Sequence, residues 1–200
     1  MYKIFDASAT VYAHKFAETC QIGITCALFV NNFVAMNTLS PLFDYQDYEL
    51  DCALLTLGTR PVVLCIGSDR VTGDCLGPIV GQMLIERNAD AHVYGCLDKP
   101  VTALNLRDCV KTIKSTHGDK KVLAVDSSVG KSSDIGKIGI AFGAIAPGSA
   151  DGKKLPKVGD VSITATVTDA EKVPLSAVRL GTVYALAREI ADRIMRYIGR

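Results

Sequence analysis

The chain has 200 residues, of which 48% are hydrophobic and 22% charged, and its formal net charge is +1. This composition excludes a disordered chain and indicates a domain with a substantial core, while the balanced charge gives no indication of nucleic-acid binding. Seven cysteines without a CxxC pair match neither a zinc ribbon nor a secreted disulfide framework, which favours the cytoplasm.

The first 60 residues show no regular alternation of strands and helices. We expect helices within Ser8–Met36 and Tyr45–Leu57, in an extension packed on a core that covers 61–200. The most apolar stretch, Ile22–Leu39, is interrupted by three asparagines, so we expect a buried or partner-covered helix and no membrane span. The same apolar extension is a candidate surface for a homodimer.

From Pro61 onward the sequence predicts alternating strands and helices. The apolar run Val62–Ile66 is typical of a strand buried on both faces. A glycine-containing loop, Gly67–Gly73, leads into a helix whose apolar residues recur with helical spacing. This inward face consists of Leu76, Ile79, Val80, Met83 and Leu84.

Four more strands and two more helices follow. The strands are predicted at His92–Leu97, Lys121–Asp126, Lys137–Phe142 and Asp160–Thr168, and the helices at Val101–Thr116, with Leu104 inward, and at Leu175–Ile198. Strands separated by helices predict an α/β fold with a mostly parallel five-stranded sheet covered on both faces. The two strands between residues 136 and 168, with no helix between them, predict one antiparallel member.

Two aspartates follow strands of this predicted sheet. Asp74 comes after the first core strand and Asp126 ends the third, and ligands of open α/β sheets bind beyond the carboxyl ends of strands. If the strands are neighbours, the two carboxylates face one cleft, where they share a proton and act as acid and base, or, farther apart, bind a divalent metal. Structural alternatives are a helix cap, from Asp74 or Thr72, and a turn at Asp126.

Other candidate motifs give weaker signals. Glycines precede the first core helix, but their spacing matches no dinucleotide or phosphate-binding loop, and no GxSxG motif is present. The three histidines are isolated in the sequence, and Cys75, at a helix N-terminus, is predicted to be a packed thiol. The basic segment Lys153–Lys157 is predicted to be a solvated face, and the alternatives are a clamp for an acidic substrate and, because a Gly-rich turn lies beside it, a mobile lid.

Four segments resemble the YyaC-type sporulation protein family of spore-forming Firmicutes. They are IGSDRVTGDCLGP (Ile66–Pro78), YGCLDKPVTALNL (Tyr94–Leu106), AVDSSVG (Ala124–Gly130) and LPKVGDVSIT (Leu155–Thr164). That family is in turn similar to the spore germination protease and the hydrogenase maturation endopeptidases. The resemblance implies a phosphorylase/hydrolase-like three-layer α/β/α fold, to which residues 1–60 would add the helical N-terminal extension expected from their sequence.

The resemblance also implies an active site. The germination protease carries catalytic aspartates in segments that align with Asp74 and Asp126. The maturation endopeptidases add a histidine at a nickel site, which would fall within 176–181, where this chain has none. This departure favours a metal-free aspartate pair and no cofactor, with a divalent metal at Asp74 and Asp126 as the alternative.

Together these observations predict a peptidase-like hydrolase of sporulation or germination, located in the cytoplasm of the sporulating cell or spore. The catalytic pair would be Asp74 and Asp126, and the substrate-binding residues would be Asp69, Arg70, Thr72, Gly73 and Ser127. The substrate would be a peptide or a protein. A non-catalytic binding or regulatory protein on the same fold is the alternative, because fold does not fix function.

Overall fold

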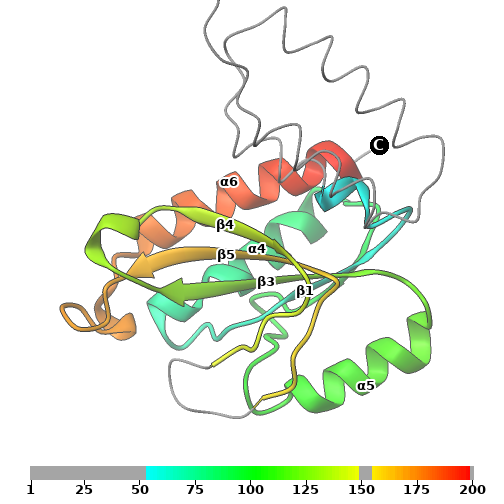
Figure 1. Ribbon diagram of the computed structural model, residues 1–200, viewed down its shortest axis with the longest axis horizontal. Coiled ribbons are helices and arrows are strands. Elements are labelled where there is room, and N and C mark those ends of the chain that lie inside the picture. Colours follow the sequence, from blue (N-terminus) through cyan, green and yellow to red (C-terminus); the bar gives the residue numbers. More distant parts are fainter. Residues whose placement is uncertain (1–52, 149–154, 199–200) are drawn as a thin grey trace, which may run out of the picture. The chain divides into compact units, whose positions relative to one another are not determined.

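The computed structural model describes residues 53–148 and 155–198 (Figure 1). The helix predicted within Ser8–Met36, the apolar stretch Ile22–Leu39 and most of the helix predicted at Tyr45–Leu57 lie outside these residues. Residues 53–55 are helical, and the chain then turns through Gly58, which has a φ of 72°. In the part that the structure describes, no helix has both the length and the apolarity needed to cross a membrane.

The core is a five-stranded sheet with the strand order β2-β1-β3-β5-β4. The strands are β1 (Val62–Cys65), β2 (His92–Tyr94), β3 (Val122–Val129), β4 (Ile138–Phe142) and β5 (Val161–Thr168). All neighbouring strands are parallel except β4, which pairs with β5 in the antiparallel direction. The predicted sheet, with its single antiparallel member, is confirmed.

Helices cover both faces of this sheet. On one face lie α4 (Leu76–Glu86) and α6 (Leu180–Ile198), which pack on residues such as Val63, Val125 and Ile163. On the other face α5 (Leu106–His117) packs on Val62, Leu64 and Ala124. Side chains at alternate positions of β1 and β3 therefore pack on opposite faces of the sheet, against different helices, because successive side chains of a strand point to opposite faces.

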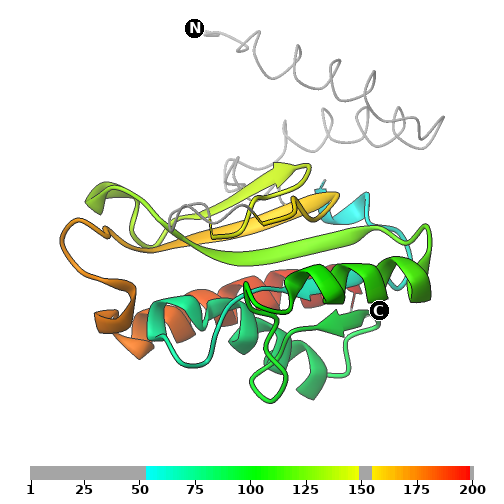
Figure 2. The same ribbon diagram turned by 90° about the horizontal axis from the view of Figure 1, so that it is seen from below.

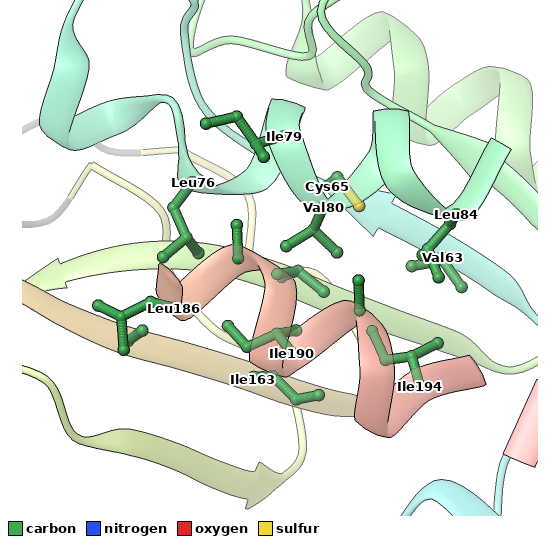
Figure 3. Close-up of a cluster of buried hydrophobic side chains, with 14 of the residues drawn as sticks. Val63, Cys65, Leu76, Ile79, Val80, Leu84, Ile163, Leu186, Ile190 and Ile194 are labelled. Carbon is green, nitrogen blue, oxygen red and sulfur yellow. The ribbon is translucent and has the colours of Figure 1, made fainter. Parts of the chain in front are cut away.

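The larger core cluster lies under α4 and α6. Figure 3 shows Leu76, Val80 and Leu84 of α4 and Leu186, Ile190 and Ile194 of α6 together with sheet residues. The inward residues predicted for the first core helix are all buried. Gly81 permits this packing, because a Cβ there would collide with the carbonyl oxygen of Gly95 beyond β2.

The region between β2 and α5 differs from the sequence prediction. The strand ends at Tyr94 because Gly95 takes a φ of 87°, and α5 begins only at Leu106. Val101 pairs instead with Ile66 in an isolated parallel bridge. Leu104, predicted to face inward, lies in the preceding loop and is 96% exposed.

Candidate active site

Asp126 lies where the sheet changes width. The last residue of β1, Cys65, is in register with Val125 of β3, so Asp126 is the first position of β3 beyond the end of its neighbour β1. The prediction that the third strand ends on this carboxylate is wrong. The strand continues to Val129 because β5 pairs with it on the other side, with Asp126 opposite Thr164; Figure 2 shows β3 and β5 side by side.

Asp74 is carried back toward the end of β1 by a tight loop. The backbone N–H of Ser68 donates to the Asp74 carbonyl at 3.1 Å, and the Asp74 N–H donates to the Val71 carbonyl at 2.9 Å. Gly67 allows this closure, because a Cβ at its position would meet the Asp74 carbonyl oxygen. Asp74 is therefore the last residue of the short 3-10 helix η1 (Thr72–Asp74).

The capping alternative for Asp74 and Thr72 is wrong. The N-cap residue of α4 is Cys75, and no side-chain hydrogen bond caps the helix there.

The two aspartates line one small cavity of about 320 Å³. Ser127, Thr164 and Leu175 also line it. Leu175 begins the 3-10 helix η4 (Leu175–Ala177), which packs against η1 because Gly73 has no side chain to separate them. Loops from three parts of the chain thus enclose the space between Asp74 and Asp126.

Electrostatics set Asp126 apart from an ordinary carboxylate. Its residue is only 8% exposed, and burial raises its pKa from 3.8 to about 8, with a second contribution from the negative charge of Asp74. A hydrogen bond from the Ser127 backbone N–H opposes this rise. Asp126 is therefore a weaker acid than an ordinary aspartate, and it lines the same cavity as Asp74.

The other predicted site residues are divided between two places. Ser127 shares the cavity with Asp126. Asp69 and Arg70 are exposed and line a separate, wider groove of about 1650 Å³, which Asp74 also borders. Asp74 and Leu175 border both spaces, so the groove and the cavity adjoin there.

Thr72 and Gly73 act through the backbone. The Thr72 carbonyl accepts a hydrogen bond from the Cys75 N–H at 3.2 Å. Gly73 is buried, and a Cβ on it would collide with Leu175. The two residues shape the turn that presents Asp74, and neither lines the cavity or the groove.

The sequence prediction missed Thr164 and Leu175 as cavity residues. A signal for Thr164 was present, since polar residues occupy the alternate positions Ser162, Thr164 and Thr166 of β5. These positions face the side of the sheet opposite the main core. No comparable signal exists for Leu175, because only tertiary packing places its helix over the glycine of η1.

The cysteine and histidine predictions have different outcomes. Cys75 is 7% exposed, and burial followed by the charges of Asp69 and Asp74 raises the pKa of its thiol, which confirms a packed thiol. His92 and His117 are not isolated in space, because their ring centroids are 4.1 Å apart. The Tyr94 hydroxyl also lies 2.8 Å from His117 Nε2, so this cluster ties β2 to the end of α5.

The residues around the cavity do not fit a nickel ion. No histidine or cysteine lines it, and nickel sites of this kind require such donors in addition to carboxylates. Across 53–148 and 155–198, no group of three or more His, Cys, Asp and Glu side chains is arranged to hold a metal ion.

The fold and the site define a class of protein: a three-layer α/β protein with two carboxyl groups beyond the end of a central parallel strand. The chain belongs to the family described as a protein of unknown function, DUF1256, which matches residues 45–193. It is 39% identical over 139 residues to the uncharacterized protein YyaC of Bacillus subtilis strain 168, covering 68% of each chain. The predicted family membership is confirmed.

Two solved structures from Thermococcus kodakarensis have a similar course of the chain. The [NiFe] hydrogenase maturation protease HycI is 18% identical, with a TM-score of 0.49, and the match covers 71% of this chain and 94% of that one. The maturation protease HybD is 11% identical, with a TM-score of 0.46, over 70% and 99% of the two chains.

Proposed function

We propose that this protein is a peptidase-like hydrolase in which Asp74 and Asp126 act as a general base and a general acid. The observation that carries the proposal is the raised pKa of Asp126, beside Asp74 on the wall of one cavity. Two neighbouring carboxyl groups with one proton between them are the pair that acid–base hydrolysis requires, because one can accept a proton while the other donates.

The proposed reaction cleaves an amide bond with one water molecule. The Asp74 carboxylate takes a proton from the water molecule while the water oxygen bonds to the carbonyl carbon of the substrate. At the same time Asp126 gives its proton to the carbonyl oxygen. The tetrahedral intermediate then collapses: the C–N bond breaks, Asp74 passes its proton to the leaving nitrogen, and Asp126 recovers a proton from the hydroxyl group. Both groups return to their starting states.

The biological setting extends this proposal. Segments from Ile66 to Thr164 resemble a sporulation family, so we place the enzyme in the cytoplasm of the sporulating cell or spore, with a peptide or protein substrate. In this proposal Ser127 and Thr164, which line the cavity, help to orient that substrate. The predicted homodimer remains a proposal, which light scattering on the full chain and on a chain lacking residues 1–55 would test; a monomeric full chain would refute it.

The test of the proposed function uses Asp74→Asn and Asp126→Asn in the full chain. Each variant replaces the chromosomal copy in the spore-forming host, and its folding is checked by circular dichroism. Spore extracts are compared by mass spectrometry for peptides that appear only when the wild-type protein is present. Loss of those peptides in both variants supports the proposal. Wild-type spores and peptides in both variants, with normal folding, would instead support a binding or regulatory protein.

A further inference from the structure

The wide groove beside Asp74 runs along the outer edge of β2. Its lining includes Ile85 of α4 and Thr112 of α5, which cover opposite faces of the sheet. A single groove can reach both helices only by passing the edge of the sheet, and β2, whose Val93 and Tyr94 also line it, is the edge strand on that side. The groove therefore leads from the edge strand to the candidate active site.

The loop from Pro100 to Asn105, which is held by hydrogen bonds, presents the exposed side chain of Leu104 to this groove. The Asn105 Oδ1 accepts the Thr102 backbone N–H at 2.7 Å, and Asn105 Nδ2 donates to the Pro100 carbonyl at 3.1 Å. The Leu104 N–H donates to the Thr102 hydroxyl at 3.2 Å. Leu104 lines the groove, yet it is 96% exposed. The hydrogen-bonded loop therefore exposes a large apolar side chain to water. Ile85 and Leu97, also in the lining, are 46% and 39% exposed.

The backbone of β2 offers a polypeptide partner along the same edge. The His92 N–H donates to Pro61 ahead of β1, and successive residues of a strand direct their backbone groups to opposite sides. The N–H and carbonyl groups of Val93 therefore point away from β1. Within the described residues no strand pairs with this outer edge, so it can accept an added extended segment.

The charge of the groove differs from that of the whole chain. Its lining contains four aspartates, Asp69, Asp74, Asp98 and Asp108, and two basic residues, Arg70 and Lys99. One aspartate, Asp108, has a salt bridge to Lys111 at 3.2 Å. The lining is thus acidic in a chain whose net charge is +1, which complements a basic partner.

We propose that this groove binds an extended, basic polypeptide segment, which adds to the edge of β2 and places a large apolar side chain against Leu104. The segment continues to Asp74, where the groove adjoins the cavity; this last step rests on the proposed function. Leu104 is then a specificity-determining residue, and the substrate is an unfolded or extended part of a protein that carries lysine or arginine beside leucine-like residues.

Fluorescence anisotropy with the full chain and fluorescein-labelled 12-residue peptides tests the proposal. The peptides share a Gly/Ser background: one has a Leu-Leu pair flanked by lysines, one has glutamates in place of the lysines, and one has serines in place of the leucines. We expect the first to bind at least about fivefold more tightly than either of the others, because it offers both the charge and the apolar contact. Equal binding of the three peptides would overturn the proposal.

Variants locate the site. Leu104→Asn is expected to weaken binding of the Lys/Leu peptide by about fivefold to tenfold, as loss of one well-buried apolar contact does. The free energy of unfolding should not change, because the side chain is exposed in the free protein. The matched control is Leu180→Asn on α6, which removes another leucine, 59% exposed and outside the groove lining. Equal affinities of Leu104→Asn and the wild type would overturn the assignment.

The same peptides separate this proposal from the proposed function. Asp126→Asn is expected to bind the Lys/Leu peptide with nearly wild-type affinity, because Asp126 lies outside the groove lining. If binding depends on Leu104 but the wild type cleaves no peptide, the groove proposal is supported and the proposed hydrolase function is refuted. If cleavage depends on Asp126 but not on Leu104, the hydrolase function is supported and the groove proposal is refuted.

Discussion

Two buried aspartates, one in β3 and one directly after its parallel neighbour β5, show how differently the same side chain is used in this protein. Asp126 in β3 is 8% exposed, and Asp169, directly after β5, is 9% exposed. The two residues thus have nearly the same exposed fraction, but burial is the largest contribution to the pKa only for Asp126. The pKa of Asp126 is raised, to about 8, and that of Asp169 is lowered.

The surroundings of Asp169 explain its lowered pKa. The Ser132 hydroxyl donates to its carboxylate at 2.7 Å, which makes the largest contribution. The Glu171 backbone N–H donates at 3.3 Å, and the Lys172 ammonium lies 3.4 Å away. These groups stabilise the ionised form and together outweigh burial. Asp169 therefore ties the turn after β5 to the 3-10 helix η2 (Ser132–Asp134).

Asp126 lacks this kind of compensation. The Ser127 N–H is the one group that lowers its pKa, while burial and the charge of Asp74 raise it. The difference teaches that burial of a carboxyl group does not by itself indicate chemistry. The donors around the carboxyl group matter as well, and a buried acid beside a second acid is an arrangement often found where protons are transferred.

The largest expected difference between the two aspartates is in hydrolysis. Asp126→Asn should reduce the rate by about 10² to 10⁴, the usual contribution of a general acid. Asp169→Asn should leave the rate within about threefold, because that carboxylate ties two loops together. The measurement is the rate of peptide release from the natural substrate identified in spore extracts. Similar losses in both variants would remove the functional distinction.

The next effect is on stability as a function of pH. The pKa of Asp126 is higher in the folded state, about 8, than its ordinary value of 3.8, so its stabilising contribution is complete below pH 3.8 and is lost as the pH rises to about 8. Within that window the free energy of unfolding should fall by up to about 1.4 kcal/mol per pH unit from this group.

Asp126→Asn removes this titration, so the variant should gain stability relative to the wild type as the pH rises from 5 to 8. Urea denaturation at several pH values measures the difference. The control for general destabilisation is Ile163→Val, which changes the buried core without adding or removing a titratable group. If the wild type and Asp126→Asn keep a constant difference over this range, Asp126 is ionised like an ordinary carboxylate.

A smaller effect is expected from Asp74→Asn. Removing the neighbouring negative charge should lower the pKa of Asp126, yet leave it above the ordinary value, because burial is the larger cause of the rise. The carboxyl carbon shift of Asp126 in a ¹³C NMR titration reports this change directly. A pKa that does not move would show that the two carboxyl groups are not coupled.

The smallest effect concerns Asp169. Ser132→Ala removes the hydrogen bond that contributes most to its lowered pKa. A lowered pKa stabilises the fold above the ordinary pKa of an aspartate, and this stabilisation is lost as the pH falls through the folded value. The variant should thus be slightly less stable at pH 7, with a difference that shrinks on acidification. Thr166→Ser, which retains a hydroxyl, serves as the control; a difference that grows toward low pH would contradict the assignment.

The sequence predicted much of this fold because burial requires regular patterns. The apolar run Val62–Ile66 and the spacing of Leu76, Ile79 and Val80 can be satisfied only by a buried strand and an amphipathic helix. The position of Asp74 after a strand followed from the same pattern, whereas Asp126 lies within β3 and not after it. Leu104 was mispredicted because its spacing also fits a helix, whereas the Asn105 hydrogen bonds and the bridge from Val101 to Ile66 delay that helix.

What the sequence determined by itself was local: which segments form strands and helices, which faces are apolar, and which carboxyl groups follow strands. Strand order, the extension of β3 beyond β1 and the packing of η4 on Gly73 were decided by tertiary structure. These contacts join residues far apart in the chain, so no local pattern encodes them. The pKa of Asp126 depends on that burial and on Asp74, and for this reason its chemical character emerges only when the chain is folded.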